Sequence, residues 1–180
     1  MHRLPMTLPH IIRVIGMPRS GTAFASMLLA LHCDCISYHE LASYDKSWRE
    51  TIANNEADLV ADCNTYGFMH EAQIPANVLI YLDRNAKSSR DATFNSAGHD
   101  LTLQQLENTR KMMQQWAIEK EAFVMNEGII FTLEGMELLW TTAFGNHVPF
   151  PKEKAVELLK LNVQHHNPKI RFGKEGGFEL

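Results

Sequence analysis

A single short segment carries most of the residues that could do chemistry. It follows Gly16 and reads Met-Pro-Arg-Ser-Gly-Thr. Pro18 stiffens the turn, and the glycines at its two ends permit backbone angles that other residues avoid. A helix that starts near Ala23 would direct the amides of residues 20–23 out of its N-terminus, a position that attracts anions. Since Arg19 adds a fixed positive charge, the segment predicts a phosphate-binding loop.

The spacing from Gly16 to Gly21 matches the start of the ATP-binding Walker motif, G-x-x-x-x-G-K-[ST]. Thr22 stands in the lysine position, and Ala23 stands where a hydroxyl would hold magnesium. The predicted loop therefore has the phosphate-cradling glycines without the metal-coordinating chemistry. The alternative is an ordinary β-turn that caps a helix. The candidate anion-binding residues are Arg19, Ser20, Gly21, Thr22 and Ala23.

Two further candidates, His39 and Glu40, follow the short apolar run at 35–38. If that run is a second parallel strand, both side chains lie at its end, beside the phosphate loop. A carboxylate close to bound phosphates has its pKa raised by like charge, which suits a general base. The alternative is a solvated surface glutamate.

Arg84 is the third candidate, because it follows the clear strand pattern Val-Leu-Ile-Tyr-Leu at 78–82. An arginine that ends a buried strand lies at the carboxyl edge of the sheet, where open α/β sheets bind their ligands. The alternative is a surface ion pair with Asp83 or Asp91.

The cysteines and histidines at 32–39 also invite a zinc interpretation, with Cys33, Cys35 and a histidine as ligands. Structural zinc sites usually separate paired cysteines by two or more residues, and no second cysteine pair follows. Buried thiols are the preferred interpretation, and we predict no metal site.

Strand and helix patterns alternate along the chain, which predicts an α/β fold with a parallel sheet covered on both faces. No linker or repeat divides the chain, so we expect a single domain over residues 1–180. Residues 59–61 are ambiguous between a strand and a buried turn. The helix patterns cover 23–31, 43–57, 100–120 (with Asp100 as cap), 133–144 and 152–164, and a late strand covers 122–125.

Composition excludes several classes of protein. The chain has 180 residues, of which 45% are hydrophobic and 21% charged, with a net charge of −4. The acidic balance argues against nucleic-acid binding, which normally requires a basic face. No apolar run is long enough to span a membrane, and the first ten residues lack the apolar core of a secretory signal. Three cysteines make no disulfide framework, so we expect a cytoplasmic protein.

The loop sequence GMPRSGT closely resembles the 5′-phosphosulfate loop of sulfotransferases, which grips the 5′-phosphate of 3′-phosphoadenosine 5′-phosphosulfate (PAPS). The stretch IYLDRN resembles the second signature of that family, whose arginine and a later serine hold the 3′-phosphate. Arg84 matches the arginine. Ala92 occupies the serine position, and Thr93 is one place away. Arg171 and Lys174 loosely resemble the late Arg-Lys-Gly segment that closes over the nucleotide in cytosolic members.

The resemblance implies a P-loop, sulfotransferase-like three-layer α/β/α fold and transfer of a sulfuryl group from PAPS to a hydroxyl or amine. The acceptor would be a small molecule or a peptide, and no metal is required. Tyrosylprotein sulfotransferases carry a glutamate base at the position of Glu40, whereas other branches use a histidine, here His39. The alternatives are a P-loop small-molecule kinase, disfavoured by Thr22 and Ala23, and a non-catalytic nucleotide-binding module.

Overall fold

The computed structural model describes residues 9–65, 68, 73–97, 102–161 and 171–172. In chain order the elements are β1 (His10–Gly16), α1 (Thr22–Leu29), β2 (Cys35–His39), α2 (Leu41–Tyr44), α3 (Trp48–Ala53), β3 (Leu59–Asn64), β4 (Val78–Leu82), α4 (Ala86–Ala97), α5 (Leu103–Glu119), β5 (Phe123–Met125), the 3₁₀ helix η2 (Ile129–Phe131), α6 (Leu133–Phe144), α7 (Lys152–Lys160) and β6 (Arg171–Phe172).

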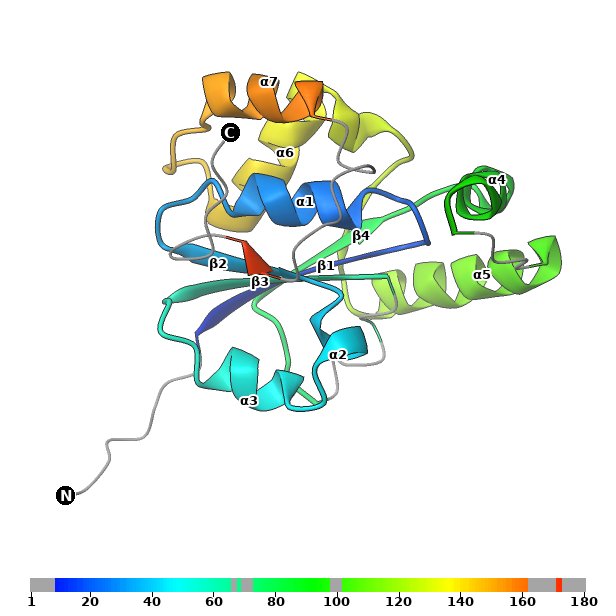
Figure 1. The fold of residues 1–180 in the computed structure, drawn as a ribbon, viewed down its shortest axis with the longest axis horizontal. Coiled ribbons are helices and arrows are strands. Elements are labelled where there is room, and N and C mark those ends of the chain that lie inside the picture. Colours follow the sequence, from blue (N-terminus) through cyan, green and yellow to red (C-terminus); the bar gives the residue numbers. More distant parts are fainter. Residues whose placement is uncertain (1–8, 66–67, 69–72, 98–101, 162–170, 173–180) are drawn as a thin grey trace.

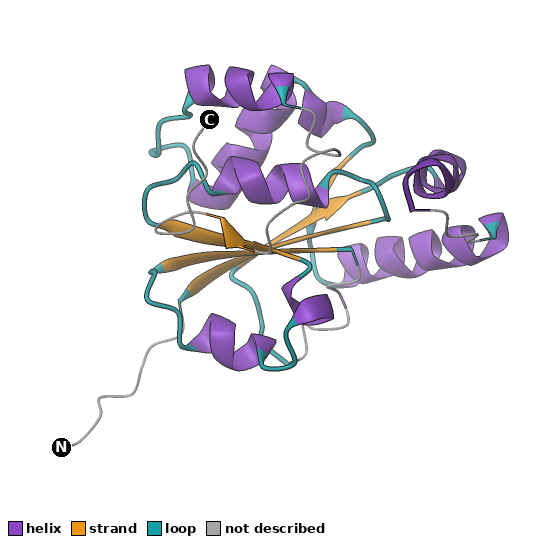
Figure 2. Cartoon of the chain, in the orientation of Figure 1, coloured by secondary structure: helices purple, strands orange, loops and turns teal. Residues whose placement is uncertain are grey.

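The six strands of the described residues form one sheet in the order β5-β4-β1-β3-β2-β6. Figure 2 shows this sheet with helices on both of its sides. The five strands β1 to β5 are parallel, and β6 pairs with β2 in the antiparallel direction. Helices α1, α6 and α7 cover one face of the sheet, and α2 and α3 cover the other (Figure 1). This arrangement confirms the predicted α/β class with a central parallel sheet between helical layers. The ambiguous run at 59–61 is part of β3, between β1 and β2.

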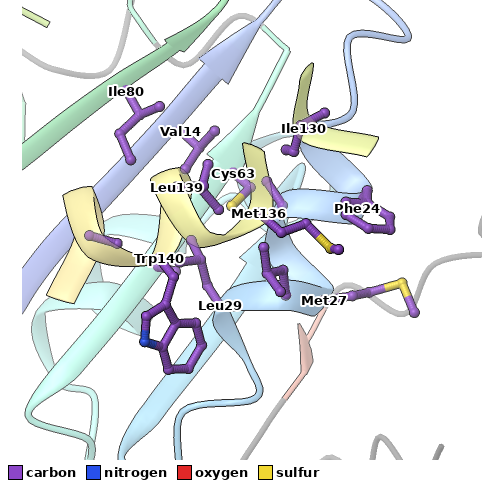
Figure 3. Close-up of a cluster of buried hydrophobic side chains, with 14 of the residues drawn as sticks. Val14, Phe24, Met27, Leu29, Cys63, Ile80, Ile130, Met136, Leu139 and Trp140 are labelled. Carbon is purple, nitrogen blue, oxygen red and sulfur yellow. The ribbon is translucent and has the colours of Figure 1, made fainter. Parts of the chain in front are cut away.

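β1 is the centre of the sheet and is buried from Ile11 to its end, which explains its continuous run of β-branched residues. Ile12 and Val14 pack into the cluster formed with α1 and α6. Ile11 belongs to a second cluster with α3, on the other face. Figure 3 shows Val14 on the sheet, facing the side chains of α1 and α6, among them Trp140.

Arg13 is an unexpected charge inside this strand, because it is completely buried. Its Nε lies 2.9 Å from Oδ2 of Asp62, which is its register partner on β3. Its Nη1 donates to the carbonyl of Ile74 over 2.7 Å, and Asn64 donates to the other oxygen of Asp62. The buried guanidinium is thus paired, as its desolvation requires.

Two predicted helices have different bounds in the structure. The pattern at 43–57 divides into α2 and α3, because the carboxylate of Asp45 accepts bonds from the amide and hydroxyl of Ser47 and from the hydroxyl of Thr51. Such local side-chain bonds end one helix and begin the next. The helix expected from residue 100 starts at Leu103, with Thr102 and Gln105 forming a capping box. Asp100, the expected cap, lies outside the described residues.

Candidate anion-binding active site

The candidate site lies at the carboxyl edge of the sheet, around the ends of β1 and β4, and this region is called the crevice below. From β1 the chain continues through α1 to β2, which lies on the β3 side of β1 in the sheet. From β4 it continues to β5, which lies on the opposite side of the pair formed by β1 and β4. Such a switch in direction opens a crevice beyond the strand ends, where open α/β sheets bind ligands. The predicted phosphate loop leaves β1 here, and Arg84 leaves β4 here.

The loop at 17–21 has the tight backbone that its glycines predict. A Cβ on Gly16 would lie 2.0 Å from the hydroxyl oxygen of Ser20, so only glycine fits there. Gly21 has a φ of 106°, which glycine adopts without strain. Arg19 also has a positive φ, of 64°, an uncommon conformation for a residue with a side chain. The loop is therefore held in a single strained shape.

The start of α1 presents backbone amides to this crevice. Its first hydrogen bond runs from the amide of Ala25 to the carbonyl of Gly21 over 2.8 Å, so the amides of Thr22, Ala23 and Phe24 lie ahead of it. No side chain caps this end of the helix, and its first turn contains no acidic residue. An uncapped helix N-terminus favours a bound anion.

The prediction was wrong for one amide of the loop. The Ser20 amide donates to the carbonyl of Met17 over 3.0 Å, so it closes the turn and does not point out of the helix. The Ser20 hydroxyl takes its place as a donor. It is buried and has no hydrogen-bond partner among the described residues, and the same is true of Nε of Arg19. Buried polar atoms normally have partners, so both groups are available to hydrogen-bond an anion at the loop.

Arg84 lies against the loop, as predicted for a crevice residue. Its Nη1 donates to the carbonyl of Arg19, its Nη2 donates to the carbonyl of Ser88 over 3.4 Å, and its Nε lies 3.6 Å from Oε1 of Glu127. The alternative, a surface ion pair, is present with a different partner: Arg84 pairs with Glu127, whereas Asp83 binds Arg110 over 2.6 Å.

Ser89, in the first turns of α4, completes the support of the loop. Its hydroxyl donates to the carbonyl of Pro18 over 2.6 Å. Together with Arg84, it binds two successive carbonyls of the loop, those of Pro18 and Arg19. Two of the loop carbonyls are therefore satisfied by β4 and α4, and do not compete with an anion for the donors of the crevice.

His39 lies at the end of β2, beside the first residue of α1. Its Nε2 is 3.4 Å from the hydroxyl of Thr22 and 3.9 Å from Oε1 of Glu40. Burial lowers the pKa of His39 to about 4, and the charge of Arg19 adds to the decrease. The ring is therefore neutral at physiological pH.

Glu40 follows in a left-handed conformation, with a φ of 54°. Its Oε1 accepts hydrogen bonds from both the amide and the hydroxyl of Thr65, and its Oε2 lies 3.4 Å from the hydroxyl of Ser43. Burial raises its pKa above the ordinary value, although the Thr65 bonds oppose the increase. The alternative of a solvated surface glutamate is therefore wrong.

The structure does not describe the side chains of the remaining predicted site residues. Thr93 belongs to α4, but its side chain is not among those that the structure describes. Arg171 belongs to β6, opposite Tyr38 of β2, and its side chain is likewise not described. Lys174 lies outside the described residues.

Of the two cysteines considered as zinc ligands, Cys33 is exposed and Cys35 is buried. Burial raises the pKa of Cys35 to about 12, which opposes the thiolate that zinc requires. Possible ligand atoms of His32, Cys33 and Asp34 do come within 4.8 Å of one another. This group lies just before the start of β2, whereas His39 and Glu40 of the candidate site lie at the end of that strand.

Three residues around the crevice were missed by sequence reasoning: Thr65, Glu127 and Phe131. Thr65 and Glu127 follow strands, a signal that also marks many residues without function. Phe131 approaches Gly21, since a Cβ there would lie 3.1 Å from the ring, and the ring packs edge-on against Phe24. It remains 44% exposed, which leaves apolar surface beside the loop.

Comparison with protein-family models finds none that matches this chain, and comparison with curated proteins finds no match either. Among the described residues, no helix has the length and apolar character needed to cross a membrane.

Proposed function

We propose that this chain is a sulfotransferase that moves a sulfuryl group from PAPS to a hydroxyl or amine of a small-molecule or peptide acceptor. One observation carries the proposal. The crevice combines an uncapped helix N-terminus, a buried and unpartnered Ser20 hydroxyl, and two arginines from different strand ends, Arg19 and Arg84. These groups suit a ligand that carries anionic groups.

The residue types favour PAPS over a nucleoside triphosphate. A Walker loop needs a lysine for the β- and γ-phosphates and a hydroxyl for magnesium, and Thr22 and Ala23 supply neither. The Thr22 hydroxyl points toward His39 instead. With arginines as the cationic groups, the chain suits the 5′- and 3′-phosphates of PAPS.

Arg19 and the amides of α1 would hold the 5′-phosphosulfate, and Arg84 would hold the 3′-phosphate. The described bonds of Arg84 engage one hydrogen of Nη1 and one of Nη2, so each nitrogen keeps a second hydrogen for a ligand. Phe131 offers its exposed ring to an apolar part of the ligand.

The reaction that follows is an in-line transfer. Glu40 takes the proton of the acceptor hydroxyl while the acceptor oxygen forms a bond to sulfur. The bond between sulfur and the 5′-phosphate oxygen breaks, and 3′-phosphoadenosine 5′-phosphate (PAP) leaves with the negative charge. The amides of α1 and the guanidinium of Arg19 stabilise that charge as it develops.

Glu40 is a better candidate for the base than His39. A general base works best when its pKa lies near the operating pH. Burial raises the pKa of Glu40 toward that range, whereas burial and Arg19 lower the pKa of His39 away from it. His39 then serves as a neutral group between Thr22 and Glu40.

The proposal is tested by incubating the full chain with PAPS and a panel of phenol, sugar and peptide acceptors, without magnesium. We expect formation of PAP and of a sulfated acceptor, measured by chromatography and mass spectrometry. Turnover of ATP that depends on magnesium would overturn the proposal in favour of a kinase. Binding of PAP without turnover across the panel would favour a non-catalytic module.

A further inference from the structure

Thr65 makes two hydrogen bonds to one atom of the candidate base. It follows β3, the strand that lies between β1 and β2. Its amide donates to Oε1 of Glu40 over 2.7 Å, and its hydroxyl donates to the same oxygen. The amide of Glu40 in turn donates to the carbonyl of Cys63 over 2.9 Å, so Glu40 is tied to β3 at both its backbone and its side chain.

These bonds make the two carboxylate oxygens unequal. Oε1 already accepts two donors, whereas the described contact of Oε2 is the Ser43 hydroxyl at a long 3.4 Å. The side chain is only 17% exposed, and its backbone is held in the left-handed region. Oε2 is therefore the oxygen with capacity left to take a proton.

We propose that Thr65 is a positioning residue that fixes the orientation and the ionisation of the Glu40 carboxylate and leaves Oε2 to take the proton of the acceptor. This inference rests on the proposed function for its catalytic meaning. The Thr65 amide sets where Oε1 lies, and the hydroxyl adds a second donor that stabilises the charged form of the carboxylate.

The groups around Glu40 determine whether its pKa should rise or fall when the Thr65 hydroxyl is removed. Among the described residues, His39 of β2 lies 3.9 Å away and is neutral, and the Asp62 carboxylate of β3 raises the pKa of Glu40. Asp62 is itself paired with Arg13. Because burial already raises the pKa of Glu40 and the Thr65 hydroxyl opposes that increase, loss of the hydroxyl should raise the pKa further.

The experiment compares Thr65→Val, which removes the hydroxyl but keeps the amide and the shape, with Thr65→Ser, which restores the hydroxyl. Carbon-13 NMR of the full chain follows the titration of the Glu40 carboxyl, whose signal is identified by its loss in Glu40→Gln. We expect a higher Glu40 pKa in Thr65→Val and a value near wild type in Thr65→Ser. With an acceptor in hand, the acid limb of the rate profile should move to higher pH in Thr65→Val. Its rate at saturating PAPS should fall about tenfold, with unchanged PAP affinity.

An unchanged Glu40 pKa in Thr65→Val overturns the inference, and so does a Thr65→Ser variant that behaves like Thr65→Val. Thr65→Ala replaces Thr65→Val if the latter does not fold. The NMR readout needs no substrate, so it separates the two proposals. The expected pKa changes in a protein that transfers no sulfuryl group would support the role of Thr65 and contradict the proposed function.

Discussion

Arg19 uses its backbone and its side chain for different purposes. Its carbonyl accepts a bond from Arg84, while its guanidinium carries an unpartnered buried Nε and lowers the pKa of His39. Its positive φ of 64° is strained for any residue that has a Cβ, so most substitutions would keep that strain. Glycine is the substitution that removes the charge without that strain.

Arg19→Gly should therefore weaken PAP binding while leaving the fold intact. Loss of one charged hydrogen bond corresponds to roughly 1.5–3 kcal/mol, or about 10- to 100-fold in affinity. Calorimetry of PAP binding measures this loss, with Arg49→Gly as a control at an exposed arginine. The pKa of His39 should also rise in Arg19→Gly, measured by proton NMR. Wild-type affinity in this variant would show that Arg19 does not touch the ligand.

His39 should make the protein less stable in acid. Its pKa is about 4 in the folded chain and about 6.5 in the unfolded chain, so the unfolded chain binds the proton first as pH falls. This contribution to stability is complete above pH 6.5 and is lost as pH falls toward 4. Between pH 7 and pH 5 the loss is about 2 kcal/mol.

Urea unfolding at the two pH values tests this contribution in His39→Asn, whose free energy of unfolding should fall less than that of wild type. The comparison is repeated in a Glu40→Gln background, because Glu40 titrates with the opposite sign. An identical pH dependence in His39→Asn and wild type would contradict a buried, neutral His39.

Glu40→Gln separates catalysis from binding. The variant keeps an oxygen for Thr65 but cannot take a proton. It should bind PAP like wild type, and its transfer rate should fall by about 10²–10⁴-fold. His39→Asn is the matched control, and a dead His39→Asn beside an active Glu40→Gln would reassign the base.

Stability gives a second check on Glu40. Since its pKa is raised in the folded chain, the ionised form costs stability above that pKa. Glu40→Gln should therefore be more stable than wild type at neutral pH, and the difference should shrink as pH falls toward 4.5. This can be measured by thermal unfolding before any acceptor is known.

The sequence could place Arg19, His39, Glu40 and Arg84 at one edge of the sheet, because each lies at or after the end of a strand and parallel strands end at one edge. It could not identify Thr65 as the partner of Glu40. The two residues are 25 positions apart, and their contact depends on β3 lying between β1 and β2, which no local pattern specifies. The same holds for Ser89, which binds a carbonyl 71 positions away.

At the scale of elements, the turn after β4 and the start of α4 support the loop at 17–21. Arg84 and Ser89 bind the carbonyls of Arg19 and Pro18, which fixes the peptides of a strained turn. The sequence predicted the strand at 78–82, yet the packing of Arg84 and Ser89 against the loop becomes visible only in three dimensions.

Ser89→Ala should loosen the loop without removing any group that touches the ligand. The half-buried carbonyl of Pro18 loses its side-chain donor, which costs about 0.5–1.5 kcal/mol. We expect lower stability by that amount and a weaker affinity for PAP, measured by urea unfolding and calorimetry. Ser88→Ala is the neighbouring control. If Ser89→Ala and Ser88→Ala bind PAP equally well, Ser89 does not support the loop.

At the scale of elements, the hydrophobic pattern of the sequence does not determine where a helix ends. The hydrophobic spacing at 43–57 is helical throughout, but Asp45 bonds to Ser47 and Thr51 and divides it into two short helices. A short polar side chain competes with the helix backbone locally, and the outcome depends on packing that a periodic pattern does not encode.

At the scale of the whole molecule, the order of the strands determines where the candidate site lies. β1 lies between β3 and β4 in the sheet. Because β1 and β4 are neighbours and parallel, the loop after β1 and Arg84 after β4 meet in one crevice. Alternation of strands and helices predicted the parallel sheet. It did not predict that β3 would insert between β1 and β2, because the order of strands is a long-range property.

The central claim is that this crevice binds a nucleotide with phosphates at both the 5′- and 3′-positions. Calorimetry of PAP and AMP binding, without magnesium, tests it most directly, since the two ligands differ only in the 3′-phosphate. We predict that PAP binds roughly 10- to 100-fold more tightly than AMP, and that Arg84→Ala removes most of this difference. Equal affinities of the wild-type protein for PAP and AMP would contradict the account.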